Sequence, residues 1–216
     1  DNTGRDLLSR TLMAGRISLA IGLLAGVVAV VIGVLYGAAA GFSGGKIDEV
    51  MMRIVDVLYS LPFIFFVIML VVFFGRNFVL MFLAVGAVLW LDMARIVRGQ
   101  ALSIRRQEYV QAAEAMGVGQ RGILLRHVIP NLLGPVVIYM TLLVPQVIIL
   151  ESFLSFLGLG VQEPMTSWGV LISVGAKNIG YANWLLLFPA FFLVSTLFAL
   201  NFVGDGLRDA LDPKDR

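Results

Sequence analysis

The glycine-rich segment at residues 40–47, AGFSGGKI, contains the residue types that bind phosphate in nucleotide-binding loops. Such a loop needs Gly, four residues, Gly-Lys and then Ser or Thr, whose hydroxyl holds Mg²⁺. Here the first position is Ala40 and the last is Ile47. We therefore interpret the segment as a glycine-rich turn without a nucleotide site.

Metal and hydrolytic chemistry have equally little support. The chain has one histidine, His127, and no cysteine, so no cluster of His and Cys ligands and no Ser-His-Asp arrangement is plausible. No pair of carboxylates is placed for hydrolysis. We expect His127 at the level of lipid headgroups, and a chain that catalyses nothing and binds no cofactor itself.

The long polar segment at residues 92–127 is the strongest candidate for a functional site. It holds six arginines (95, 98, 105, 106, 121 and 126) against three acids (92, 108 and 114). The composition of residues 103–126 favours helix, which Gly117 and Gly119 should break. Small residues at 112, 113 and 115 would let this helix enter a groove on another protein, while the flanking arginines hold lipid phosphates or acidic partner residues. The alternative is a solvated helix that merely joins two membrane spans.

Membrane helices must position this segment. Hydrophobic residues make up 59% of the chain and charged residues 14%, against about 25% charged in soluble domains. Charge-free runs cover residues 17–45, 57–75, 77–91, 128–150 and 178–204. A spanning helix needs about 20 residues, so the third run suffices only if its helix continues to about Gly99, with Asp92 and Arg95 paired one turn apart. We therefore predict an all-α, polytopic membrane protein with five transmembrane helices.

The arginines also predict the orientation, because short loops rich in Lys and Arg stay in the cytoplasm. Residues 92–127 are then inside, together with residues 43–56 and the tail at 205–216. An amphipathic lead-in (1–16), a turn (75–77) and a loop (151–177) are outside, and residues 17–204 form the transmembrane domain. Arg5, Arg10 and Arg16 conflict with this assignment, but the longer Arg-rich loop outweighs them. The small net charge of +2 gives little support for nucleic-acid binding.

Two further segments carry a pattern. Residues 17–45 show a stripe of small residues, which lets helix backbones approach closely in lipid. The stripe comprises Gly22, Gly26, Ala29, Gly33, Gly37 and Gly41. It could pack inside the chain or against a partner subunit. Residues 151–177 predict a short interfacial or re-entrant helix ending at Gly158 or Gly160, with Trp168 and Trp184 as anchors at the membrane interface.

The acidic residues bear on how transport could be powered. Asp56, Asp92, Glu151 and Asp205 fall at the ends of the predicted spans, so we expect no ionisable group within the membrane. Ion-coupled carriers usually have such a group, and many are built from inverted repeats of broken helices, which are not evident here. Uphill transport would then need an external motor. An ion-coupled carrier and a homo-oligomeric channel are the alternatives.

The polar segment resembles the cytoplasmic loop of binding-protein-dependent ABC importer permeases. The family pattern is Glu-Ala-Ala, three residues, Gly, nine residues and Ile-x-Leu-Pro. Residues 111–113 (QAA), Gly117 and residues 127–130 (HVIP) match it in register at Ala-Ala, Gly and Pro. Gln111 replaces the glutamate, and His127 and Ile129 replace the aliphatic positions. Because Gln111 is uncharged, a salt bridge made by the family's glutamate is not expected here. The helix and the glycine of the pattern are expected to remain.

Other segments are similar to the peptide and nickel branch of this family: residues 4–10 (GRDLLSR), 15–19 (GRISL), 154–160 (LSFLGLG), 167–169 (SWG) and 206–213 (GLRDALDP). Residues 90–100 (WLDMARIVRGQ) and 151–154 (ESFL) look most like the C-type subunits of bacterial oligopeptide importers. Members of this branch typically have one further N-terminal span. We expect an N-terminal portion to be missing here.

The resemblance implies a type I importer permease in a bacterial inner membrane that forms half of the pathway for oligopeptides. Its partners would be a second homologous permease, two cytoplasmic ATPases that bind ATP and Mg, an extracytoplasmic peptide-binding protein, the peptide and membrane lipid. A permease for dipeptides, glutathione or nickel is the alternative within the family. The residues implied in ATPase coupling are Gln111, Ala112, Ala113, Glu114, Gly117 and Pro130. Those implied at an external gate or binding-protein contact are Glu151, Phe153, Gly158, Gly160 and Trp168.

Overall fold

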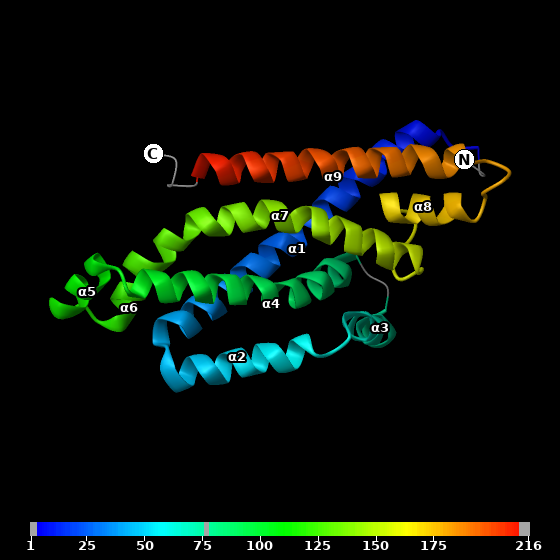
Figure 1. The fold of residues 1–216 in the computed structure, drawn as a ribbon. Helices are drawn as coiled ribbons and strands as arrows, with labels where there is room; N and C mark the ends of the chain where they lie inside the picture. Colours follow the sequence, from blue (N-terminus) through cyan, green and yellow to red (C-terminus); the bar gives the residue numbers. More distant parts are fainter. Residues whose placement is uncertain (1–3, 76–77, 212–216) are drawn as a thin grey trace.

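The computed structural model describes residues 4–75 and 78–211, and the regular structure within those ranges is helical. The elements are α1 (Leu7–Ser43), α2 (Gly45–Tyr59), α3 (Phe63–Phe74), α4 (Phe78–Arg105), α5 (Glu108–Ala115), α6 (Gln120–Ile123), the π-helix η1 (Leu124–Val128), α7 (Ile129–Phe156), α8 (Trp168–Ala176) and α9 (Trp184–Leu211). Figure 1 shows α5 and α6 at one end of an elongated bundle and α8 at the other. The all-α prediction is confirmed for the described residues.

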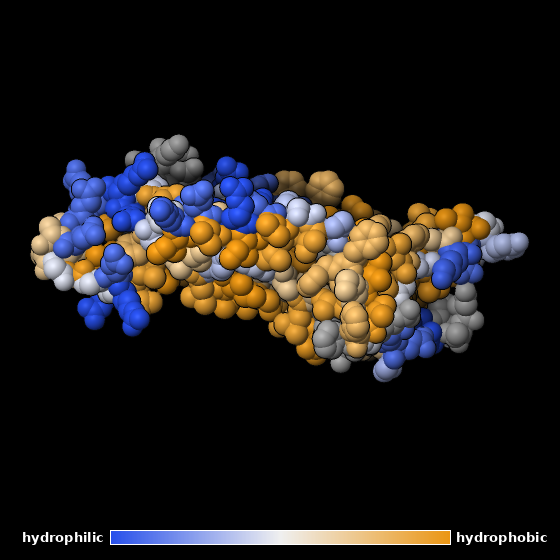
Figure 2. Space-filling model, turned by 90° about the horizontal axis from the view of Figure 1, so that it is seen from below, coloured by the Kyte–Doolittle hydropathy of each residue, from blue (hydrophilic) through white to orange (hydrophobic). Residues whose placement is uncertain are grey.

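Three helical stretches in the described part of the chain are long and apolar enough to cross a membrane. They are Leu7–Ser43, Gln120–Phe156 and Trp184–Ala210. Helix α4 runs past Gly99 to Arg105, as the predicted third span requires. On the face drawn in Figure 2, hydrophobic residues cover the middle of the molecule and hydrophilic residues gather toward its ends. This distribution fits a bundle that stands across a bilayer.

Residues 57–75, predicted to form one spanning helix, are divided between two helices in the structure. Helix α2 ends at Tyr59, and the chain bends by 81° before α3 continues. Pro62 explains the break, because a proline disfavours helical geometry in the residue before it. Residues 43–56, predicted as a loop, mostly belong to α2. With 12 residues, α3 is about 18 Å long and too short to cross the membrane unaided.

The small-residue stripe of α1 packs inside the chain. A Cβ placed on Gly33 would lie 2.6 Å from the Cβ of Met93 on α4, and one on Gly37 would overlap the carbonyl of Ala94. Gly22 faces Val144 and Ile148 on α7 in the same way. Helix α1 therefore holds α4 and α7 together at close backbone distance, which confirms the interpretation of the stripe as internal packing.

The segment predicted to be external begins later in the chain than residue 151. Helix α7 continues through Glu151 and ends at Phe156, two residues before Gly158, which has φ +79°. Glu151 is therefore part of a long membrane helix and not of a loop. The separate short helix of this segment is α8, whose N-cap Ser167 accepts a hydrogen bond from the backbone N–H of Val170.

Candidate functional site

Helix α5 is ended by a hydrogen-bonded turn. The N–H of Gly117 donates to the carbonyl of Glu114, and the N–H of Val118 donates to that of Ala113. This pair of bonds is a Schellman motif, which needs a left-handed residue at the position of Gly117 (φ +82°). The predicted glycine stop is confirmed, but α4 still covers residues 103–105 and the separate helix α5 begins at Glu108.

The two faces of α5 have different surroundings. Ala113 is 3% exposed and Val110 is 1% exposed, and they pack in the apolar core with Ile123 of α6. Gln111, Ala112, Glu114 and Ala115 are exposed. A partner could therefore reach Ala112 and Ala115, whereas Ala113 anchors the helix to its own chain.

Gln111 has an internal role that the sequence did not indicate. Its side-chain amide donates to the carbonyl of Arg106 at 3.1 Å. This bond braces the turn between α4 and α5. The residue that departs from the family pattern thus supports the start of the exposed helix.

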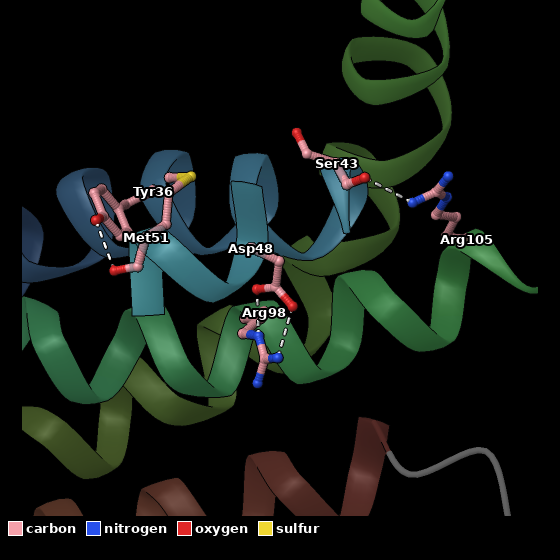
Figure 3. Close-up of polar contacts among 6 residues, drawn as sticks. All are labelled: Tyr36, Ser43, Asp48, Met51, Arg98 and Arg105. Carbon is pink, nitrogen blue, oxygen red and sulfur yellow. Dashed lines mark hydrogen bonds and ion pairs between the residues drawn. The ribbon is translucent and has the colours of Figure 1, made fainter. Parts of the chain in front are cut away.

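Three of the arginines near this loop bind within the chain. Arg98 forms a two-pronged ion pair with Asp48, at 2.5 and 2.6 Å, and Arg105 donates to the carbonyl of Ser43 at 3.1 Å (Figure 3). Arg95 pairs with Asp56 at 2.8 Å. The predicted pair of Asp92 with Arg95 is therefore wrong, because Asp56 on α2 holds the guanidinium. These bonds tie the C-terminal end of α4 to α1 and α2, and they leave the exposed Arg106, Arg121 and Arg126 available to lipid or a partner.

Pro130 lies near the start of α7, as predicted, but within a continuous helical stretch. A proline inside a helix lacks the N–H of one hydrogen bond and clashes with a carbonyl one turn earlier. The π-helical turn over Leu124–Val128 precedes it and accommodates this defect. His127 lies in that turn, with its ring centroid 6.3 Å from that of Tyr109 on α5.

At the opposite end, Glu151 is completely buried in a cluster of hydroxyl groups. Ser155 donates to its Oε1 at 2.6 Å and Ser18 donates to its Oε2 at 3.2 Å. The backbone N–H of Trp168 donates in turn to Ser18 Oγ at 3.2 Å. Glu151 thus connects α7 with α1 and α8. The expectation that no ionisable group lies within a spanning helix is wrong at this position.

The other predicted external residues fall into two groups. Trp168 is 3% exposed, packs against Gly15, and donates through Nε1 to the carbonyl of Thr11. It is not an interface anchor, whereas Trp184 is 56% exposed and remains suited to that role. Gly160 is also buried, and it lies so close to Ser155 that an added Cβ would overlap that side chain. Phe153 and Gly158 are exposed. Any direct contact with a binding protein therefore falls to this exposed pair and not to Glu151, Gly160 or Trp168.

Sequence reasoning missed the Glu151 cluster and the pair of Asp48 with Arg98. A signal for the first existed, because Ser155 follows Glu151 by four residues and so lies on the same helix face. Ser18 and Ser167 come from distant elements, and nothing in the sequence placed them there. The Asp48–Arg98 pair spans 50 residues and depends on the close approach of α2 to α4.

Residues 11–216 match the family of binding-protein-dependent transport system inner membrane components. The chain belongs to this family. The permease is 62% identical, over its whole length, to the oligopeptide transport system permease protein OppC of Escherichia coli K12, of which it covers 72%. It is 46% identical to OppC of Bacillus subtilis and 48% identical to the dipeptide transport system permease protein DppC of that species, covering 71% and 68% of them.

The permease also shares its fold with solved transporters. A chain of the MetNI methionine ABC transporter in inward-facing conformations superposes with a TM-score of 0.75 at 21% identity, over 94% of this chain and 96% of that one. A chain of an amino acid ABC transporter gives 0.62 at 17% identity, over 94% and 95%. The predicted type I permease fold and the inner-membrane location are confirmed.

Proposed function

We propose that this permease forms half of the translocation pathway of an ATP-driven oligopeptide importer. The observation that carries the proposal is the exposed face of α5, which is packed through Ala113 onto the polar end of a membrane bundle whose sequence is 62% identical to an oligopeptide permease. Within the family, the OppC relatives favour oligopeptides over the glutathione and nickel alternatives. The oligopeptide and dipeptide permeases of B. subtilis are almost equally similar to this chain, at 46% and 48% identity, so a dipeptide is the alternative substrate to test.

The packing around α5 supports mechanical coupling. A push on its exposed face would reach α6 through Ala113 and Ile123, and the continuous helix Gln120–Phe156 through η1. Arg105 and Arg98 link the end of α4 to α1 and α2. The helices can therefore move as one body when a partner displaces α5. In the outer half, the Glu151 cluster keeps α1, α7 and α8 together during such a movement.

The proposed partners follow from this arrangement. Two cytoplasmic ATPases would bind ATP and Mg and perform the hydrolysis, while this chain remains non-catalytic. A second permease would complete the pathway, and an extracytoplasmic binding protein would deliver the peptide to the end that contains α8. The exposed Phe153 and Gly158 are the predicted contacts there.

Replacing Ala112 with Phe tests the coupling role. The side chain at this position is exposed, so the substitution leaves the internal packing intact but blocks close docking of α5. We expect ATP-driven uptake of a tripeptide by the reconstituted transporter to fall at least about tenfold. The control is Ala210→Phe, the same change at an exposed position near the end of α9, which should retain uptake. Equal uptake by both variants would refute coupling through α5, and preferred uptake of dipeptides over longer peptides would refute the substrate assignment.

A further inference from the structure

A groove of about 470 Å³ between α4 and α7 has no part in the contacts described so far. It is lined by Asp92, Met93, Arg95, Ile96, Tyr139, Leu142, Leu143 and Gln146. The lining residues from α7 are Tyr139, Leu142, Leu143 and Gln146. Their spacing of three or four residues places them on one face of that helix. The volume falls in the range of small-molecule sites, about 300–1,000 Å³.

The polar side chains of this groove are unused within the chain. Among the described residues, Asp92, Tyr139 and Gln146 have no side-chain hydrogen bond or ion pair. Arg95 is the nearest cation in sequence, but its guanidinium binds Asp56 and lies 4.3 Å from the centre of the Tyr59 ring. Asp92 is therefore a half-buried carboxylate without a counter-ion.

The position of Asp92 makes this unusual. It lies near the middle of the 28-residue helix α4, about 20 Å from either end. A charged side chain on a membrane helix is rarely left facing lipid without a partner, because moving its charge into hydrocarbon is costly. The opposite face of α4 packs against the glycines of α1. The Asp92 face should thus border water and a cationic ligand rather than hydrocarbon.

We propose that this groove is a subsite of the permeation path that receives the α-ammonium group of the peptide, with Asp92 as its counter-ion. The inference rests on the proposed function. A transporter of varied peptides meets many side chains, but each unmodified peptide carries the same cationic amino terminus at neutral pH. Tyr139 and Gln146 supply further oxygen acceptors, and Met93, Leu142 and Leu143 form an apolar wall for the first side chain.

A single cysteine can report on the groove because the chain contains none. The experiment uses the assembled transporter with Gln146→Cys in this chain and no other cysteine. Methanethiosulfonate reagents that carry either an ethylammonium group or a neutral group are compared by their rates of modification. We expect the ammonium reagent to be favoured, and Asp92→Asn to lower that preference at least about threefold by removing the nearby charge. Asp205→Asn, the same change at an exposed site on α9, should leave the preference unchanged.

Peptide protection identifies the ligand. Trialanine should slow the modification of the thiol introduced by Gln146→Cys at least about threefold more than N-acetyltrialanine, which has no ammonium group, and Asp92→Asn should abolish the difference. Equal protection by both peptides would overturn the proposal. So would a thiol that stays unreactive because a partner subunit covers the groove. ATP-driven uptake of trialanine by the parent transporter is measured in parallel. If trialanine is taken up but Asp92→Asn does not change the protection of the thiol, the subsite is refuted and the proposed function stands. If trialanine is not taken up at all, the proposed function is refuted.

Discussion

Glu151 shows how one side chain can determine the geometry of the end of the bundle that contains α8. Its carboxylate accepts hydrogen bonds from Ser155 on its own helix and from Ser18 on α1. Ser18 in turn accepts from the first residue of α8, Trp168. A buried carboxylate is costly unless its oxygens are bonded, so this cluster specifies one arrangement of three elements.

Replacing Glu151 should therefore destabilise the fold. Glu151→Ala leaves the hydroxyls of Ser18 and Ser155 without their acceptor, and we expect the free energy of unfolding to fall by about 2–3 kcal/mol. Glu151→Gln keeps an acceptor oxygen and the volume, and should lose less than half as much. Reversible unfolding in mixed detergent micelles measures both. Glu49→Ala, at an exposed acid on α2, should change the value by no more than about 0.5 kcal/mol, and a loss at Glu151 equally small would contradict the role of the cluster.

At this scale the sequence predicted what depends on local geometry. Gly117 ends a helix because only its own backbone conformation matters, so the residue and its neighbours sufficed. The buried state of Trp168 and the partner of Arg95 depend on which distant helix lies opposite. Trp168 meets Gly15 and Thr11, more than 150 residues away, and a general preference of tryptophan for membrane interfaces could not reveal that.

The pairing of α1 with α4 is the central contact between elements. Gly33, Gly37 and Gly41 face the backbone of α4 along three successive turns. The prediction of a close-packing stripe was confirmed because small residues at this spacing have few other uses in a membrane helix. The break between α2 and α3 was not predicted, because hydropathy stays high across Pro62 while the backbone direction changes.

A matched pair of glycine substitutions tests this packing. Gly37→Ala places a Cβ against the carbonyl of Ala94 and must push the helices apart, so the free energy of unfolding should fall by about 1–3 kcal/mol. Gly99 on α4 has nothing within 4 Å of the added Cβ. Gly99→Ala should raise stability by up to about 1 kcal/mol through helix propensity. Thermal unfolding of the two purified variants measures the difference, and equal changes would rule out the close approach of α1 and α4.

At the scale of the whole molecule, the two ends differ in construction. The end with α5 and α6 carries Arg105, Arg106, Arg121 and Arg126 and an exposed short helix, whereas the end with α8 carries Arg5 and Arg10 and is closed by the Glu151 cluster (Figure 1). Composition and charge predicted this polarity because both are properties of long stretches. The number and course of the spans were harder to predict. Helix α7 extends six residues beyond its apolar run, and α2 with α3 forms a bent pair.

The same polarity predicts the orientation in the membrane. Lys46 lies at the start of α2, next to the α5 end, and Tyr181, which is 91% exposed, lies between α8 and α9. In cells from which the outer membrane has been removed, a membrane-impermeant maleimide should label Tyr181→Cys and leave Lys46→Cys unlabelled, because the Arg-rich end faces the cytoplasm. Permeabilising the membrane should make Lys46→Cys reactive, which controls for burial of the thiol. Labelling of Lys46→Cys in the intact membrane, with protection of Tyr181→Cys, would show that the chain is inserted the opposite way and that α5 cannot meet a cytoplasmic motor.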